Sequence, residues 1–180
     1  MPPARRGQER TSGLAGLVGQ RSCVRLLAKT DVGGTKMAKY DQKTKAEPLS
    51  PEGFIEAIEN PQRRAEARQL LQIYGAASGY PARVYTGGMI GFGHYSYTYA
   101  SGHSGTAMAT GFAPRKAELS LYGLLWGEAA SALLPQLGKV RAGVGCVYAR
   151  KLADVDLAVL SRQIALGLDH LRGLYPVTPV

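Results

Sequence analysis

The strongest alternation of apolar and polar residues lies at positions 90–105, in the sequence IGFGHYSYTYASGHSG. An apolar start, alternating tyrosines and a glycine-rich end predict a β-strand that closes in a hairpin loop at residues 100–105. Residues 106–122 contain two more short alternating segments, joined by a turn at 113–117. Three successive strands connected by short turns predict an antiparallel β-meander in the middle of the chain.

The bulky side chains of the first predicted strand change parity along it. They are Ile90, Phe92, Tyr95, Tyr97 and Tyr99. The first two occupy even positions and the tyrosines odd positions, so a regular strand would place them on opposite faces. A bulge near Gly91 or Gly93 would bring all of them to one face. Without a bulge, the tyrosine face is the exposed or ligand-facing side of the sheet.

Two helices are predicted before the meander. Residues 50–52, Ser-Pro-Glu, combine a capping serine, a proline suited to the first helical position and a carboxylate in the first turn. An Asn-Pro pair at 60–61 ends this helix. Residues 62–78 then carry a second helix, with Gly79 just beyond its end.

The last third of the chain predicts two more helices and a short strand. A helix at 128–137 is closed by Gly138, a strand follows at 146–149, and Asp154 can cap the final helix. The apolar stripe of that helix recurs every three or four residues, at Leu157, Leu160, Ile164, Leu168 and Leu171. The fold class is therefore α+β, with an antiparallel β-meander sheet packed against N-terminal and C-terminal helices.

Length and composition fit one globular domain with an N-terminal tail. The 180 residues are 45% hydrophobic and 19% charged, which suffices for a core without disulfides or metal. Residues 1–36 are rich in arginine and glycine and keep no helical or strand period, which predicts a disordered basic tail. An organelle-targeting peptide, or translation upstream of a true start at Met37, would look similar. The α+β domain is assigned to residues 37–180.

The formal net charge of +9 is unevenly distributed, because more than half of the excess lies in residues 1–36. The remaining cations are spread along the chain, which argues against nucleic acid as a partner. Cys23 and Cys146 are far apart and form no disulfide or metal-ligand pattern, as expected in a reducing compartment. No apolar run reaches the ~20 residues of a membrane span. We expect a cytoplasmic protein without membrane contact.

Four segments carry a resemblance to a known family. They are IGFG with its tyrosine-rich strand and SG turn, GFAPRK leading into LSLY, LGKVRAGVGCVY, and KLADVDLAVL, in this order between Lys43 and Ile164. Together they resemble the YdhG-like family of bacterial domains of unknown function. The resemblance implies an α+β fold that has been likened to frataxin. One family member has been proposed to act as an iron chaperone for iron–sulfur assembly.

The iron-chaperone role implied by this resemblance needs a ridge of carboxylates on the first helical layer. Glu52, Glu56 and Glu59 recur at spacings of four and three residues and are the candidate metal ligands. Three arginines follow between residues 63 and 68, so ion pairing on a solvated helix is the alternative interpretation.

A second candidate site combines tyrosines with cations. Its residues are Tyr97, Tyr99, Arg115, Lys116 and Tyr148, and further cations at 139, 141 and 151 flank the strand that carries the last of them. Guanidinium and ammonium groups around phenols suit a small anionic ligand or a carboxylate of a partner protein. Exposed turn cations and tyrosines packed on the sheet are the alternative.

No catalytic constellation is recognised in the sequence. The glycines of GGMIGFG lead into a strand rather than a phosphate-binding helix, and GHSG lies in a hairpin loop rather than a nucleophile elbow. We therefore predict a non-enzymatic accessory protein that binds a small ligand or a partner. Iron delivery is the second hypothesis, and an enzyme with an Arg, Lys and Tyr pocket is the third.

Overall fold

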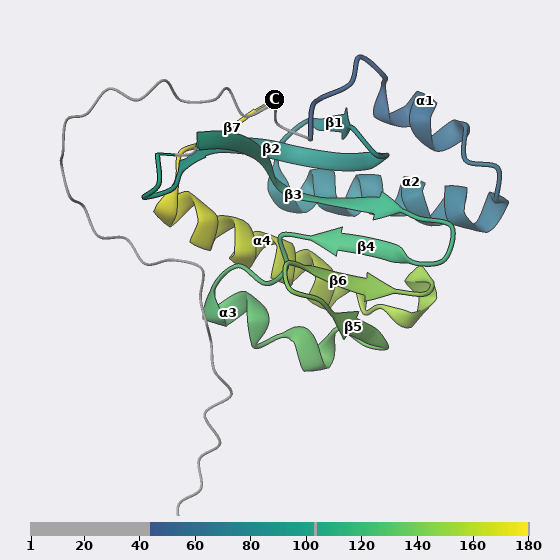
Figure 1. The fold of residues 1–180 in the computed structure, drawn as a ribbon. Coiled ribbons are helices and arrows are strands. Elements are labelled where there is room, and N and C mark those ends of the chain that lie inside the picture. Colours follow the sequence, from purple (N-terminus) through teal and green to yellow (C-terminus); the bar gives the residue numbers. More distant parts are fainter. Residues whose placement is uncertain (1–43, 103, 180) are drawn as a thin grey trace, which may run out of the picture. The chain divides into compact units, whose positions relative to one another are not determined.

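The structure, a computed structural model, describes residues 44–102 and 104–179 (Figure 1). Its helices are α1 (Pro51–Glu56), α2 (Pro61–Ser78), α3 (Gly127–Ser131) and α4 (Leu157–Leu174), with two 3-10 turns, η1 (Leu134–Gln136) and η2 (Leu152–Asp154). Its strands are β1 (Ala82–Tyr85), β2 (Met89–Thr98), β3 (Ser104–Pro114), β4 (Leu119–Tyr122), β5 (Val140–Ala142), β6 (Cys146–Ala149) and β7 (Val177–Thr178). The expected disordered tail at 1–36 lies outside the described residues.

The strands form one antiparallel sheet in the order β1-β2-β3-β4-β6-β5, with β7 paired to β2. Strands β2, β3 and β4 are consecutive neighbours, so the predicted meander is confirmed. β1 extends it at one edge, and the β5–β6 hairpin extends it at the other. The predicted α+β class is also confirmed.

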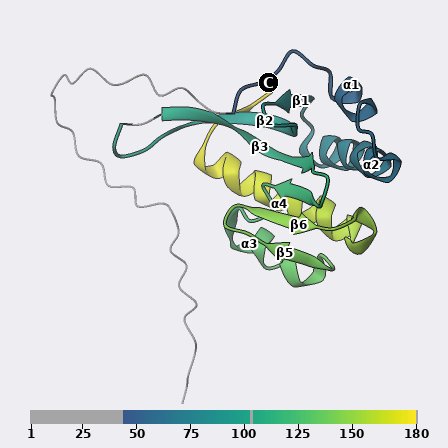
Figure 2. The ribbon, with the colours of Figure 1, turned by 45° about the vertical axis from the view of Figure 1, so that its right-hand side comes forward.

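The helices α2 and α4 lie on the same face of the sheet (Figures 1 and 2). Tyr74 of α2 packs on Phe92 and Phe112, with ring centroids 5.7 and 5.5 Å apart. The predicted apolar stripe of α4 is buried at Leu160, Ile164, Leu168 and Leu171. Each buried side chain of this size contributes about 1.5–3 kcal/mol, so this layer holds helices and sheet together. None of the helices in the described residues has the length and apolar character that a bilayer span needs.

The two N-terminal helices begin where the sequence predicts. Ser50 Oγ accepts a hydrogen bond from Gly53 N, and Asn60 Oδ1 accepts one from Arg63 N, each at 3.0 Å. Gly79 follows α2 with a φ of 71°, in the left-handed region that suits a helix end. The first helix is shorter than predicted. It ends at residue 56, whereas the sequence predicts an end near residue 60.

The strand β2 changes face at Gly93, which explains the parity of its bulky side chains. Gly93 has a φ of +62°, whereas the pairing of β2 with β3 keeps one register on both sides of it. No extra residue is inserted in this pairing, so the irregularity is a change of backbone conformation rather than the predicted bulge. Its effect is the one expected of the bulge, because Tyr95 is buried beside α4 on the side that Phe92 also faces.

The C-terminal third differs from the sequence prediction at three points. The cap of α4 is Asp156, whose Oδ1 accepts hydrogen bonds from the Ala158 and Val159 amides at 3.0 Å, so the prediction of Asp154 was wrong. The helix predicted at 128–137 is interrupted after Ser131, because Pro135 has no N–H to bond the carbonyl four residues earlier. The strands β5 and β7 have no counterpart among the predicted elements.

Replacing Gly93 with alanine is expected to lower the free energy of unfolding by roughly 1–3 kcal/mol. A Cβ here would lie 2.9 Å from the ring of Tyr80 and would force a non-glycine residue into positive φ. Gly173→Ala in α4 is the matched control, since its Cβ would meet no described atom within 4 Å and alanine is the better helix former. Urea unfolding followed by circular dichroism compares the two. A Gly93→Ala variant as stable as the wild-type chain would contradict this account of β2.

Candidate functional site

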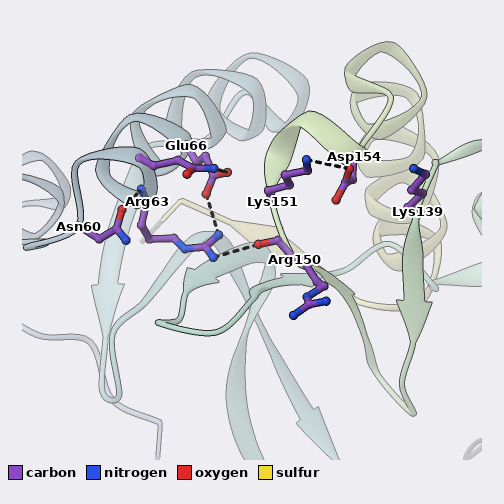
Figure 3. Close-up of a pocket in the computed structure, with 8 residues that line it drawn as sticks. Asn60, Arg63, Glu66, Lys139, Arg150, Lys151 and Asp154 are labelled. Atoms are coloured by element: carbon purple, nitrogen blue, oxygen red, sulfur yellow. Dashed lines mark hydrogen bonds and ion pairs between the residues drawn. The ribbon is translucent and has the colours of Figure 1, made fainter.

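A polar hollow of about 490 Å³, here called the basic pocket, lies between the N-terminus of α2 and the segments that follow β6 and precede β5 (Figure 3). It is lined by Asn60, Gln62, Arg63, Glu66, Lys139, Arg150, Lys151 and Asp154. Four of these residues are cations and two are carboxylates, so the lining has a formal charge of +2. Arg63 lies on α2 and the other three cations lie next to β5 and β6, so the four meet only in the folded protein.

A buried ion pair forms one wall of the basic pocket. Arg63 Nη1 donates to Glu66 Oε2 at 2.7 Å, and both side chains are only 10% exposed. Arg63 Nη2 also donates to the carbonyl of Arg150 at 3.0 Å, and the Leu152 amide donates to Glu66 Oε1 at 3.0 Å. These hydrogen bonds compensate the desolvation of both charges. They also join the first turn of α2 to the segment after β6.

The opposite wall depends on Gly138, which allows the chain to turn into β5. Gly138 has a φ of +109°, and a Cβ there would lie 2.2 Å from the carbonyl oxygen of Asp154. The Lys139 amide donates to that same carbonyl at 2.9 Å. Because these two backbones run side by side, Lys139 is placed next to Asp154, on the side of the pocket away from Asn60 and Arg63 (Figure 3).

Lys139 and Arg150 are the cations of the basic pocket that form no ion pair with a described residue. Arg63 is neutralised by its buried partner, and Lys151 Nζ lies 3.7 Å from Asp154. Lys139 and Arg150 are both exposed. In Figure 3 the Arg150 guanidinium points away from Lys151 and Asp154, toward the edge of the pocket. Lys139 and Arg150, here called the rim cations, therefore add two positive charges to the pocket that no described carboxylate pairs with.

A second hollow of about 490 Å³, here called the stacking hollow, shares Lys139 and Arg150 with the basic pocket. In it the Arg141 guanidinium lies 4.0 Å above the centre of the Tyr148 ring. Arg141 is held by Glu118 at 2.9 Å, and the Cys146 thiol donates to the Tyr148 hydroxyl at 2.8 Å. The hydrogen bond with Cys146 raises the pKa of the Tyr148 hydroxyl. This tyrosine therefore stays neutral at physiological pH and acts as a flat surface.

The predicted ligand-binding residues are divided between the two ends of the sheet. Arg115 Nη1 donates to the carbonyl of Gly87 in the β1–β2 turn. Ile90 lies close to this turn, and Tyr97 is seven residues farther along β2, a distance of about 23 Å in a strand. Lys116 is exposed on the near end, in a third hollow that shares Arg63 with the basic pocket. Of the predicted set, only Tyr148 and Lys116 lie in hollows that adjoin the basic pocket.

Tyr97 and Tyr99 belong instead to an aromatic ladder at the far end of β2. Their ring centroids are 5.1 Å apart, and Tyr97 in turn lies 6.2 Å from Tyr95. Tyr95 packs edge-on against Trp126 at 6.2 Å. Burial, together with the neighbouring tyrosines, raises the pKa of Tyr95 to about 12. The inner end of this ladder is part of the core, while Tyr99 is 54% exposed.

The three predicted iron ligands are not gathered into one site. Glu56 forms two hydrogen bonds with Arg68, at 2.6 and 2.8 Å, and this contact lowers the pKa of its carboxyl group. Glu52 lies in the first turn of α1, whereas Glu59 lies beyond the end of that helix. Among the described residues no group of three or more His, Cys, Asp or Glu side chains is placed to hold a metal ion.

The sequence indicates the cations around β6 but not the contacts that organise them. Its pattern favours a solvated helix for Arg63 and Glu66, and it does not single out Arg150. These residues are separated by more than 80 positions from the contacts that define their role. The local signals are the spacing of three residues between Arg63 and Glu66 and the cationic pair that directly follows the strand at 146–149.

Comparison of the chain with protein-family models, with curated proteins and with solved structures gives no match. The function is therefore argued from the basic pocket itself.

Replacing Glu66 with glutamine is expected to lower the free energy of unfolding by about 3 kcal/mol, because it leaves the buried Arg63 charge without a counter-ion. Glu56→Gln is the matched control, since it removes the same charge from an ion pair whose side chains are 53% and 54% exposed. Thermal and urea unfolding measure both variants. Equal unfolding midpoints for the two would show that the buried pair has no special structural role.

Proposed function

We propose that this domain binds a small anionic ligand in the basic pocket and acts as a binding or accessory protein. The observation that carries the proposal is the pair of exposed cations, Lys139 and Arg150, which form no ion pair with a described residue and stand beside a buried, hydrogen-bonded wall. Exposed cations next to a rigid polar surface attract phosphate or carboxylate groups, and arginine binds them through two parallel hydrogen bonds.

The volume and the positive electrostatic potential of the basic pocket favour a small anionic ligand. Its volume of about 490 Å³ falls within the usual range for small-molecule sites. The N-terminus of the 18-residue helix α2 borders it at Asn60 and Gln62. The helix dipole places partial positive charge at this end, which adds to the attraction of the lysine and arginine for an anion.

The chemistry of the lining favours binding over catalysis. The described lining residues are amides, cations and carboxylates, with no serine, threonine, cysteine or histidine that could act as a nucleophile. Both carboxylates are engaged, Glu66 by Arg63 and Asp154 by Lys151. A free carboxylate or imidazole that could act as a general base is therefore missing from the described lining.

Three expectations from the sequence remain predictions. They are kinship with the YdhG-like family and its frataxin-like fold, iron delivery, and recognition of a carboxylate on a protein partner. Iron delivery has no supporting arrangement among the described carboxylates. The cytoplasmic location also stays a prediction.

Removal of both rim cations, in the variant Lys139→Ala/Arg150→Ala, is expected to weaken binding of small anions at least tenfold, since each cation contributes a charge-assisted hydrogen bond. Isothermal titration calorimetry of the full chain with inorganic phosphate, pyrophosphate and citrate measures the change. Binding should also weaken as ionic strength rises to about 0.15 M, because the rim is exposed.

The matched control is Arg83→Ala/Arg162→Ala, which removes the same net charge from exposed positions on β1 and α4. It should leave the affinities almost unchanged. Equal losses in the two double variants would mean that the anions respond only to net charge. That result, or the absence of binding by all three anions, would overturn the proposal.

A further inference from the structure

The β5–β6 hairpin and the residues next to it bring two pairs of side chains to one hollow. Arg141 pairs directly with Tyr148 across the two strands. Lys139 directly precedes β5, and Arg150 directly follows β6. All four residues line the stacking hollow.

The first pair, Arg141 and Tyr148, forms a flat surface in the structure. The Arg141 guanidinium covers the Tyr148 ring at 4.0 Å and is held in place by Glu118. The Arg141 side chain is 63% exposed, so the outer face of its guanidinium remains open to a further planar group. Arginine planes stack on aromatic rings and on nucleobases in this way.

The second pair is two like charges at the ends of neighbouring strands. Lys139 and Arg150 are exposed and form no ion pair with a described residue. Two like charges that line one hollow repel each other, and an anion bound between them would relieve this repulsion. The stacking hollow therefore combines a flat stacking surface with two cations that can bind an anion.

We propose that the anionic ligand is a nucleoside monophosphate or a similar phosphate joined to a flat ring by a short linker. Its phosphate lies between Lys139 and Arg150, and its ring stacks on the outer face of the Arg141 guanidinium. This inference rests on the proposed function, because it assigns the ligand class to the same rim cations. It adds a ring-binding surface that the basic pocket alone does not contain.

The test compares adenosine monophosphate, ribose 5-phosphate and adenosine, each titrated into the full-length chain by calorimetry. The first carries ring and phosphate, the second lacks the ring, and the third lacks the phosphate. We expect adenosine monophosphate to bind roughly tenfold more tightly than ribose 5-phosphate, since stacking of one base has an effect of this order. Adenosine should bind more weakly than either phosphate.

Two variants test whether Arg141 and Tyr148 cause the tighter binding of adenosine monophosphate than of ribose 5-phosphate, here called the ring preference. Arg141→Lys keeps the charge but loses the flat guanidinium, so the preference for adenosine monophosphate should disappear while the affinity for ribose 5-phosphate is unchanged. Tyr148→Leu should have the same effect by removing the support of the stack. Arg162→Lys on α4 is the matched control and should keep the preference. Circular dichroism establishes that each variant is folded.

The outcomes separate this inference from the proposed function. Equal affinities for adenosine monophosphate and ribose 5-phosphate, both lost in Lys139→Ala/Arg150→Ala, would refute the ring-binding surface and leave anion binding intact. A ring preference that survives both Arg141→Lys and Tyr148→Leu would also refute it. If no phosphate compound binds, both proposals fail.

Discussion

The buried ion pair between Arg63 and Glu66 is the contact on which the basic pocket depends. Charges so far removed from water are costly unless every polar atom is paired. Here Glu66 accepts from Arg63, from the Leu152 amide and from Gln62, while Arg63 also donates to the Arg150 carbonyl. Two of these bonds lie within α2 and two join it to the segment after β6, so the pair fixes the start of α2 against that segment.

Backbone contacts around this ion pair set the positions of the exposed cations Lys139 and Arg150. Arg150 supplies its carbonyl to the buried pair, and its side chain points away from that pair, as Figure 3 shows. Lys139 is held by its amide bond to the Asp154 carbonyl and by the turn at Gly138. Backbone contacts rather than side-chain contacts thus place both charges, which leaves their head groups available to a ligand.

At the far end of β2, beyond Gly93, Tyr95 and Tyr97 pack in or against the core rather than line a pocket with cations. At Gly93 the backbone turns over, and the aromatic side chains beyond it pack against α4 and Trp126 instead of facing away from the helices. Tyr95 belongs to a second small core, Tyr97 packs against it, and Tyr99 is 54% exposed. Burial of Tyr95 raises its pKa to about 12, so a charged phenolate is disfavoured there.

The sequence by itself determined the features that depend on a few neighbouring residues. The caps at Ser50 and Asn60, the left-handed end at Gly79 and the stripe of α4 all follow from bonds or periods within three or four positions. The meander follows from alternating residues and the short turns between its strands. Local rules also explain why Pro135 interrupts the helix predicted around it.

Only the tertiary structure decided which distant segments meet. Asp154 and Asp156 are equally good caps by sequence, but Val155 bridges to Gly138 in an extended conformation, so α4 begins after the second aspartate. The contact between Arg63 and Arg150 spans 87 positions. The separation of Tyr97 from Arg115 likewise depends on strand register. Such pairings are set by the packing of the whole sheet and its helices, and no local pattern specifies them.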